Sequence, residues 1–237
     1  MSFFDVLGWG GHSWAYQLLL GTLTTVEISL GAYAAGLTIG CVVAIIKLYG
    51  PRWAARLANG YSTVCRAVPD IMLIIILYYS GQSALGALLA DLDIGGDYSI
   101  SGFAAAIVVL GLVQGAYASE IIRGAILSIP IGQVEAARAF GMAGPVLFRR
   151  IILPVMVPTA LGGLTNLWMA IIKDSALISV VGYNELLFTA KQAAGSSKYY
   201  FSFFLVCAGL YYILTLASNV VIHVVERRIG RWMPRAH

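Results

Sequence analysis

The sequence predicts an all-α fold in which five helices cross a membrane as a single bundle. Of the 237 residues, 59% are hydrophobic and only 11% are charged, whereas about a quarter of the residues in a soluble domain are charged. The apolar residues gather into runs long enough to cross a hydrocarbon core of about 30 Å, which takes about 20 helical residues. No run alternates like a barrel strand, and backbone groups in lipid must pair within their own segment, so we expect helices.

Five apolar runs have the length of membrane spans. The expected spans are residues 16–46, 68–89, 103–122, 151–172 and 201–225. The first run exceeds the minimum length, so we expect it to tilt or protrude. No Lys or Arg precedes it, so the basic start of a cleaved signal peptide is missing and this span is expected to be retained. No repeat or shift in composition divides the chain, and residues 1–237 are expected to form one transmembrane domain.

Positive charge predicts the orientation, because loops rich in Lys and Arg stay in the cytoplasm. Twelve of the 15 basic residues lie on one side of the predicted bundle: Lys47, Arg52, Arg56, Arg66, Arg123, Arg138, Arg149, Arg150, Arg227, Arg228, Arg231 and Arg235. The loop between the second and third spans instead carries three acids: Asp91, Asp93 and Asp97. We therefore expect an outer N-terminus and a cytoplasmic C-terminus.

Glycines recur inside two of the predicted spans. Gly31, Gly36 and Gly40 lie in the first, and Gly111 and Gly115 lie in the third. Small residues at such spacings let helix backbones approach closely in a bilayer. Because bundles of every class use them, these glycines predict close packing and carry no functional information.

The loop between the third and fourth spans predicts a short helix over residues 133–141. Pro130 and Gly132 punctuate its start, Glu135 suits the positive end of a helix dipole, and Gly141 is placed to end it. Three alanines keep the helix slim enough for a partner to approach: Ala136, Ala137 and Ala139. The same segment also fits an ordinary amphipathic loop helix.

A spaced pattern in this loop resembles the EAA loop of permease subunits in type I ATP-binding cassette (ABC) importers. The pattern is Glu135-Ala136-Ala137, then Gly141, then Ile151-x-Leu153-Pro154. It lies between two spans on the expected cytoplasmic side. The resemblance implies that this helix docks in a groove of a separate ATPase subunit and transmits its closure to the spans. The coupling residues that it implies are Glu135, Ala136, Ala137, Arg138 and Gly141.

The resemblance also implies partners. The chain lacks the G-x-x-x-x-G-K-[ST] loop that cradles nucleotide phosphates, so ATP and Mg are expected on two copies of a partner ATPase. A homologous second permease, in a heterodimer rather than a homodimer, and a periplasmic solute-binding protein complete the implied importer in a bacterial inner membrane. This chain is then a non-catalytic subunit with no cofactor or metal of its own. Its basic residues form no stripe with interleaved aromatics, so nucleic acid is not expected.

The resemblance narrows to the polar amino acid branch. Residues 115–124 look like the third span of that branch, and residues 173–177 resemble the end of its fourth. Residues 66–69 match the entry to the second span, except that Ala67 stands where glycine is usual. The ending, with Asn219 and then Glu226-Arg227-Arg228, is similar to the permeases for histidine, lysine, arginine and ornithine and to the opine permeases. The implied substrates are polar, cationic amino acids or opines.

Charges within the apolar runs predict a substrate site. An unpaired charge there costs at least a few kcal/mol, so such residues should face the bundle interior. Four residues qualify: Glu27, Glu120, Lys173 and Asp174. A cationic amino acid needs acidic partners for its cations, which Glu120 and Asp174 can supply, and a donor for its carboxylate. Lys173, Asn166 or Tyr117 can provide that donor, and Glu27 is a further candidate acid.

Structural roles for these charges are the alternative. Arg123 is one helical turn from Glu120 and can pair with it, and Lys173 can pair with an acid purely for structure. Glu185, in the segment between the last two spans, is either a contact or a helix-terminal charge.

Two other classes of membrane protein fit the sequence less well. An ion-coupled secondary amino acid carrier usually shows inverted repeats and broken helices, and no repeat is evident here. An intramembrane enzyme needs a nucleophile with its base or a set of metal ligands, and no HExxH or GxSxG motif is present.

Overall fold

The computed structural model describes residues 3–8, 13–91 and 101–230, and within these ranges the chain is helical and contains no strand. The predicted all-α fold is confirmed. In chain order the elements are α1 (Phe3–Leu7), α2 (Trp14–Tyr49), α3 (Arg52–Ala67), α4 (Asp70–Asp91), α5 (Gly102–Leu127), α6 (Ile131–Ala139), α7 (Gly144–Leu147), a π-helical turn η1 (Phe148–Ile152), α8 (Leu153–Asp174), a 3₁₀ helix η2 (Ser175–Val181), α9 (Leu186–Ser197) and α10 (Tyr200–Gly230).

Four helical segments of the described chain are long and apolar enough to cross a membrane unaided. They are Trp14–Tyr49, Gly102–Leu127, Gly144–Val181 and Tyr200–Arg228. A pair of helices, α3 and the start of α4, passes the same test together and is bent by 117°. Counted as one span, this pair brings the described chain to the five predicted spans.

Helix α3 was not predicted, because its arginines interrupt the apolar pattern. The helix is amphipathic instead, and it buries Ala58, Ser62 and Cys65 along one face. It ends at Val68, whose extended backbone (ψ 139°) precedes Pro69. A residue before proline is disfavoured in the helical region, and proline has no amide hydrogen to continue the helix. These two effects produce the bend.

Helices α2 and α5 pack backbone to backbone through the glycines noted in the sequence. A Cβ atom added at Gly40 would lie 2.5 Å from Cβ of Ala118, and one added at Gly111 would lie 2.8 Å from Cβ of Ala35. Real side chains do not approach so closely, so only glycine permits this contact. The predicted close packing is confirmed.

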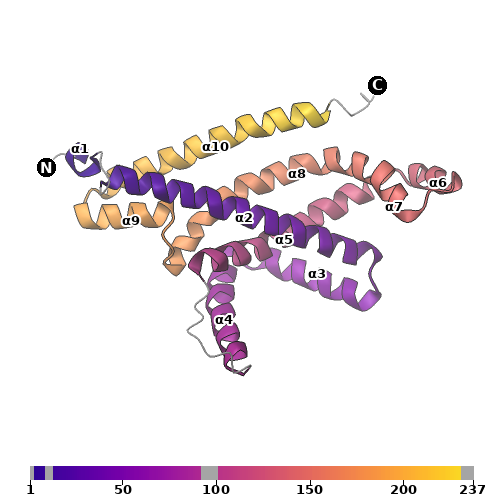
Figure 1. Ribbon diagram of the computed structural model, residues 1–237, viewed down its shortest axis with the longest axis horizontal. Helices are drawn as coiled ribbons and strands as arrows, with labels where there is room; N and C mark the ends of the chain where they lie inside the picture. The colour runs from indigo at the N-terminus through magenta and orange to yellow at the C-terminus, as the bar shows by residue number, and fades with distance from the viewer. Residues whose placement is uncertain (1–2, 9–12, 92–100, 231–237) are drawn as a thin grey trace.

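The helices run between two ends of an elongated molecule (Figure 1). The N-terminal helix α1 and helix α9 lie at one end, while α6, α7 and the C-terminal end of α10 lie at the other (Figure 1). Buried Leu18, Leu186 and Phe203 hold α9 against α2 and α10. Helix α4 stands away from the bundle (Figure 1).

Several basic residues lie inside helices rather than in loops. Lys47 belongs to α2 and Arg123 to α5, because both helices continue past their predicted ends. The prediction that these residues occupy loops is wrong, although both still lie near the end that carries α6. Other charges of the orientation prediction lie outside the described residues: Asp93, Asp97, Arg231 and Arg235.

Candidate functional site

A cluster of polar side chains lies at the middle of α5. Gln114 and Tyr117 occupy adjacent turns of this helix. The Gln114 Nε2 atom donates a hydrogen bond of 2.8 Å to Oδ2 of Asp174, and the Tyr117 hydroxyl donates one of 3.4 Å to Oδ1 of Asp70. The central span thus forms hydrogen bonds with one carboxylate from α4 and one from α8.

Both carboxylates come from places where a helix is interrupted. Asp70 is the first residue of α4, directly after the bend, and Asp174 is the last residue of α8, before the chain tightens into η2. Irregular backbone at membrane depth is tolerated where protein buries it or where it lines a cavity. The bend and the end of α8 therefore deliver acidic side chains to the centre of the bundle.

Hydrogen-bond acceptors are in excess at this cluster. Neither Asp70 nor Asp174 forms an ion pair with a described residue. The Gln114 side chain is buried, its NH₂ group donates to Asp174, and its Oε1 atom has no partner within the described chain. A buried acceptor left unpaired costs about 1–3 kcal/mol. Two carboxylates and a free amide oxygen form a site suited to an ammonium or guanidinium group.

The structure joins only some of the predicted substrate residues. Asp174 and Tyr117 lie in the cluster, and Lys173 is exposed beside Asp174 and acts electrostatically on it. Asn166 is exposed two helical turns before Asp174 on α8. Glu27 is exposed on α2. Neither of the last two meets the cluster.

Two members of the cluster were missed. Asp70 follows Pro69 at the start of an apolar run, so it resembles an ordinary first-turn acid. Gln114 is uncharged and was not considered. A polar residue at the centre of an apolar run was the signal available for Gln114.

Glu120 lies in a separate charge network closer to α6. Its Oε1 atom is 2.7 Å from Nζ of Lys47, and its Oε2 atom is 2.8 Å from Nη2 of Arg123. The Lys47 side chain is only 1% exposed, and its ammonium also donates to Ser62 and Ser119. Glu120 therefore pairs with Arg123, as the structural alternative predicted. Lys47 connects this pair to α2 and α3. Whether Glu120 also contacts substrate stays a prediction.

Glu185 is fully buried where α9 begins. Its carboxylate accepts hydrogen bonds from the amides of Leu187 and Phe188, each 2.8 Å long, which caps α9. It also accepts from the hydroxyls of Thr25 on α2 and Tyr211 on α10. Burial raises the pKa of the Glu185 carboxyl, against the opposing effect of these hydrogen bonds and of Lys191. Glu185 thus lies at a helix terminus, as one of the two alternatives predicted. It also connects three helices: α2, α9 and α10.

The predicted loop helix is α6, at Ile131–Ala139 rather than residues 133–141. It begins two residues early because Pro130 forms its N-cap, where a missing amide hydrogen has no cost. Gly141 follows its end with φ +75°. The Gly141 amide donates to the Arg138 carbonyl and the Met142 amide to the Ala137 carbonyl, which is the Schellman arrangement. The prediction that Gly141 ends the helix is confirmed.

One side of α6 is packed and the other is open. Ala137 is buried in a cluster with residues of α5 and η1. Glu135, Ala136 and Arg138 are exposed, and Phe140 just beyond the helix is 86% exposed. A large apolar side chain in this position offers a contact surface to another protein.

The sequence matches the model of a known protein family. Residues 36–231 match the family described as "Binding-protein-dependent transport system inner membrane component". The chain belongs to this family. It is therefore a permease subunit of an ABC importer, a non-catalytic membrane component, as the EAA-like loop predicted. Its family implies an ATPase, a binding protein and a second permease as partners.

Individual relatives extend the match to most of the chain. The permease is 35% identical to the octopine transport system permease of Rhizobium radiobacter over 99% of both chains. It is 36% identical to the histidine/lysine/arginine/ornithine transport system permease of Escherichia coli K12, over 92% of this chain and 96% of that one.

Solved structures match the fold of the permease. A crystal structure of an amino acid ABC transporter with histidines matches with a TM-score of 0.77 and 27% identity, over 90% of this chain and 94% of that chain. An inward-facing methionine ABC transporter matches with a TM-score of 0.73 at 21% identity, over 91% and 97% of the two chains, which supports the fold alone. These matches confirm the type I importer fold and argue against the ion-coupled carrier.

Proposed function

We propose that this permease carries cationic amino acids or opines and that the α5 cluster contacts them. The observation that carries the proposal is that α5 hydrogen-bonds two carboxylates, Asp70 and Asp174, while the Oε1 atom of Gln114 in the same cluster has no partner among the described residues. A guanidinium or ammonium group brings donors only. It would satisfy the free amide oxygen and neutralise the two acids at once.

A zwitterionic ligand also needs a donor for its carboxylate. Lys173 and Arg66 both lie within electrostatic range of the cluster and are exposed. They fit the carboxylate end, while Tyr117 positions Asp70. The names of two relatives, the octopine permease and the histidine/lysine/arginine/ornithine permease, agree with this chemistry.

Glu120, Glu27 and Asn166 have a weaker claim to substrate contact. Both carboxylate oxygens of Glu120 are paired with cations, and a ligand would have to displace one of them. We therefore assign Glu120 to holding α2, α3 and α5 together. Glu27 and Asn166 remain predicted contacts that would require a different position of the ligand along the bundle.

The assembly follows from the same surfaces. The open face of α6, with Glu135, Ala136, Arg138 and the Gly141 turn, is assigned to the groove of an ATPase. Two ATPase copies would bind ATP and Mg, and a second, homologous permease would complete a heterodimer. The end with α1 and α9 would face a periplasmic binding protein, with the N-terminus outside and the C-terminus in the cytoplasm.

The substrate proposal is tested by uptake of arginine and octopine into vesicles that contain the assembled transporter and internal ATP. Asp70→Asn and Asp174→Asn should each lower uptake about tenfold or more, because a hydrogen bond to a charged group contributes about 1.5–3 kcal/mol. The control Glu226→Gln removes a carboxylate of α10 that has no predicted contact with substrate, and it should transport normally. Normal uptake by both aspartate variants would show that the cluster does not bind substrate.

A further inference from the structure

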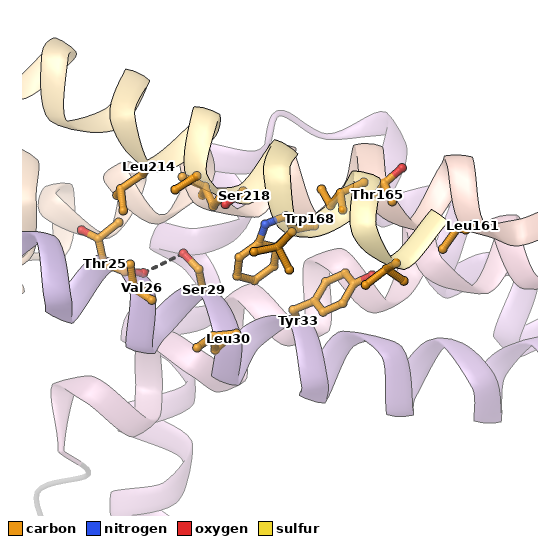
Figure 2. A pocket seen from close by; sticks show the side chains of 15 residues that line it. Thr25, Val26, Ser29, Leu30, Tyr33, Leu161, Thr165, Trp168, Leu214 and Ser218 are labelled. Carbon is orange, nitrogen blue, oxygen red and sulfur yellow. Dashed lines mark hydrogen bonds between the residues drawn. The ribbon is translucent and has the colours of Figure 1, made fainter. Parts of the chain in front are cut away.

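A long apolar groove separates α10 from α2 and α8. It is a cavity of about 500 Å³ lined by residues of these three helices, and Figure 2 shows Thr25, Tyr33, Trp168 and Leu214 along its walls. Helix α10 is held to the bundle before the groove begins, by buried Phe203 and Cys207 and by the Tyr211–Glu185 hydrogen bond.

The lining of the groove favours an apolar occupant. None of the described residues that line it is charged. Three of its hydroxyl groups donate within the protein: Ser29 to the Thr25 carbonyl at 2.6 Å, Thr165 to the Gly162 carbonyl at 2.9 Å, and Tyr33 to a carbonyl of α8 at 3.2 Å. Ser218 and the Trp168 indole add two polar groups to a lining that is otherwise mainly apolar. A substrate with charged groups would find no charged partner here, whereas a hydrocarbon chain matches the apolar walls.

The groove is elongated. Its walls on α8 (161–172) and α10 (214–225) each extend for about 16 Å at 1.5 Å per residue. A volume of about 500 Å³ along that length suits an extended hydrocarbon chain. A helix of another subunit is the competing occupant, and crosslinking distinguishes the two.

A basic residue lies beyond one end of the groove on the same face of α10. Val221 and Val225 line the cavity, and Arg228 follows them at i+7 and i+3, which places it on their face of the helix. Arg227 falls on a different face by the same rule. Both arginines are exposed. An arginine at the end of a span suits a lipid phosphate.

We propose that the groove between α2, α8 and α10 binds one acyl chain of an anionic phospholipid whose headgroup is held by Arg228. In the orientation proposed above this lipid belongs to the cytoplasmic leaflet. The lipid fills the gap and supports the half of α10 after Tyr211, most of whose described residues are exposed.

Photo-crosslinking in the assembled transporter, in native membranes, tests this inference. A leucine-sized diazirine amino acid is placed at Leu214, which lines the groove, or at Leu216, which is exposed on another face of α10. Adducts at position 214 should be enriched severalfold in anionic phospholipid, while adducts at position 216 should follow the bulk lipid composition. Arg228→Ala should reduce the enrichment about fivefold, the factor expected for one juxtamembrane arginine, and Arg227→Ala should leave it unchanged.

Three results would overturn the inference. The first is crosslinking of position 214 to the second membrane subunit, detected as a shifted polypeptide band. The second is an identical lipid composition at positions 214 and 216. The third is an equal effect of the two arginine substitutions, which would indicate a general attraction of lipid to the charged end of α10. None of these results depends on which substrate is transported.

Discussion

Glu185 shows how one buried carboxylate can hold several helices of a membrane protein. Four groups donate to it, from the start of α9, from Thr25 on α2 and from Tyr211 on α10. Low local dielectric strengthens such a network and makes an incomplete one costly. Because burial raises the pKa of Glu185 above its ordinary value of 4.5, its contribution to stability depends on pH.

The pH dependence at Glu185 has a definite sign. Between pH 4.5 and the raised pKa, the folded protein keeps a proton that the unfolded chain has lost, so stability falls as pH rises through this window and then levels off. Glu185→Gln should flatten this slope and lower stability by about 1–3 kcal/mol through a mismatched donor at the α9 amides. Thermal unfolding of the purified transporter from pH 5 to 8 measures both effects. Glu27→Gln is the control. If stability depends on pH as steeply in Glu185→Gln as in Glu27→Gln, this assignment is wrong.

Single residues of the α5 cluster were predictable where charge interrupts an apolar run or where ligand chemistry asks for a donor. Asp174 stands out on the first criterion, and Tyr117 was predicted as a donor for a ligand carboxylate. Asp70 did not stand out, because an acid in the first turn of a helix is ordinary. Asn166 and Glu27 were grouped with the cluster because sequence position alone does not give the depth at which each side chain lies.

At the scale of elements, apolar runs and glycines were informative and amphipathic segments were not. The long spans follow from composition alone. Helix α3 was missed because Arg52, Arg56 and Arg66 made it look like a loop, although its buried face recurs every three to four residues. Helix α9 was missed because Gly, Ser, Lys and Gln dilute its apolar residues, and only its packing against Leu18 and Phe203 stabilises it.

The end of α6 provides a test of coupling at this scale. Gly141→Ala places a side chain in the left-handed region, at φ +75°, which costs about 1 kcal/mol. No atom lies within 4 Å of the added methyl group, so any effect comes from backbone strain in the Schellman turn. We expect ATP-driven uptake to fall about fivefold at an unchanged level of assembled complex.

The matched control for that test is Gly144→Ala. Gly144 also has open space around it, but its φ is not positive, so its uptake should equal that of the wild type. Equal uptake by the Gly141 and Gly144 variants, at equal assembly, would contradict a coupling role for the turn.

At the scale of the whole molecule, charge and architecture agree on two distinct ends. The end with α6 collects most of the basic residues, and the end with α1 and α9 collects few (Figure 1). Positive residues near span ends are retained in the cytoplasm. The fold therefore predicts the side on which each connecting segment can be reached.

Cysteine labelling measures that topology directly. In a chain with Cys41, Cys65 and Cys207 replaced, Ser196→Cys on α9 should react with an impermeant maleimide in intact spheroplasts. Ser128→Cys, before α6, should react only after permeabilisation. Both serines are exposed, so reversed reactivity would mean that the chain is inserted the other way round.

The glycine contact between α2 and α5 limits how this protein can move. Two helices whose backbones touch at Gly40 and Gly111 cannot slide or rotate past each other without a collision. The pair is in effect a fixed frame. We therefore expect the displacement that opens a path on one side and closes it on the other to fall on the more exposed segments, the arm formed by α4 and the outlying half of α10. In that case a transport cycle moves the edges of this protein around a stationary centre.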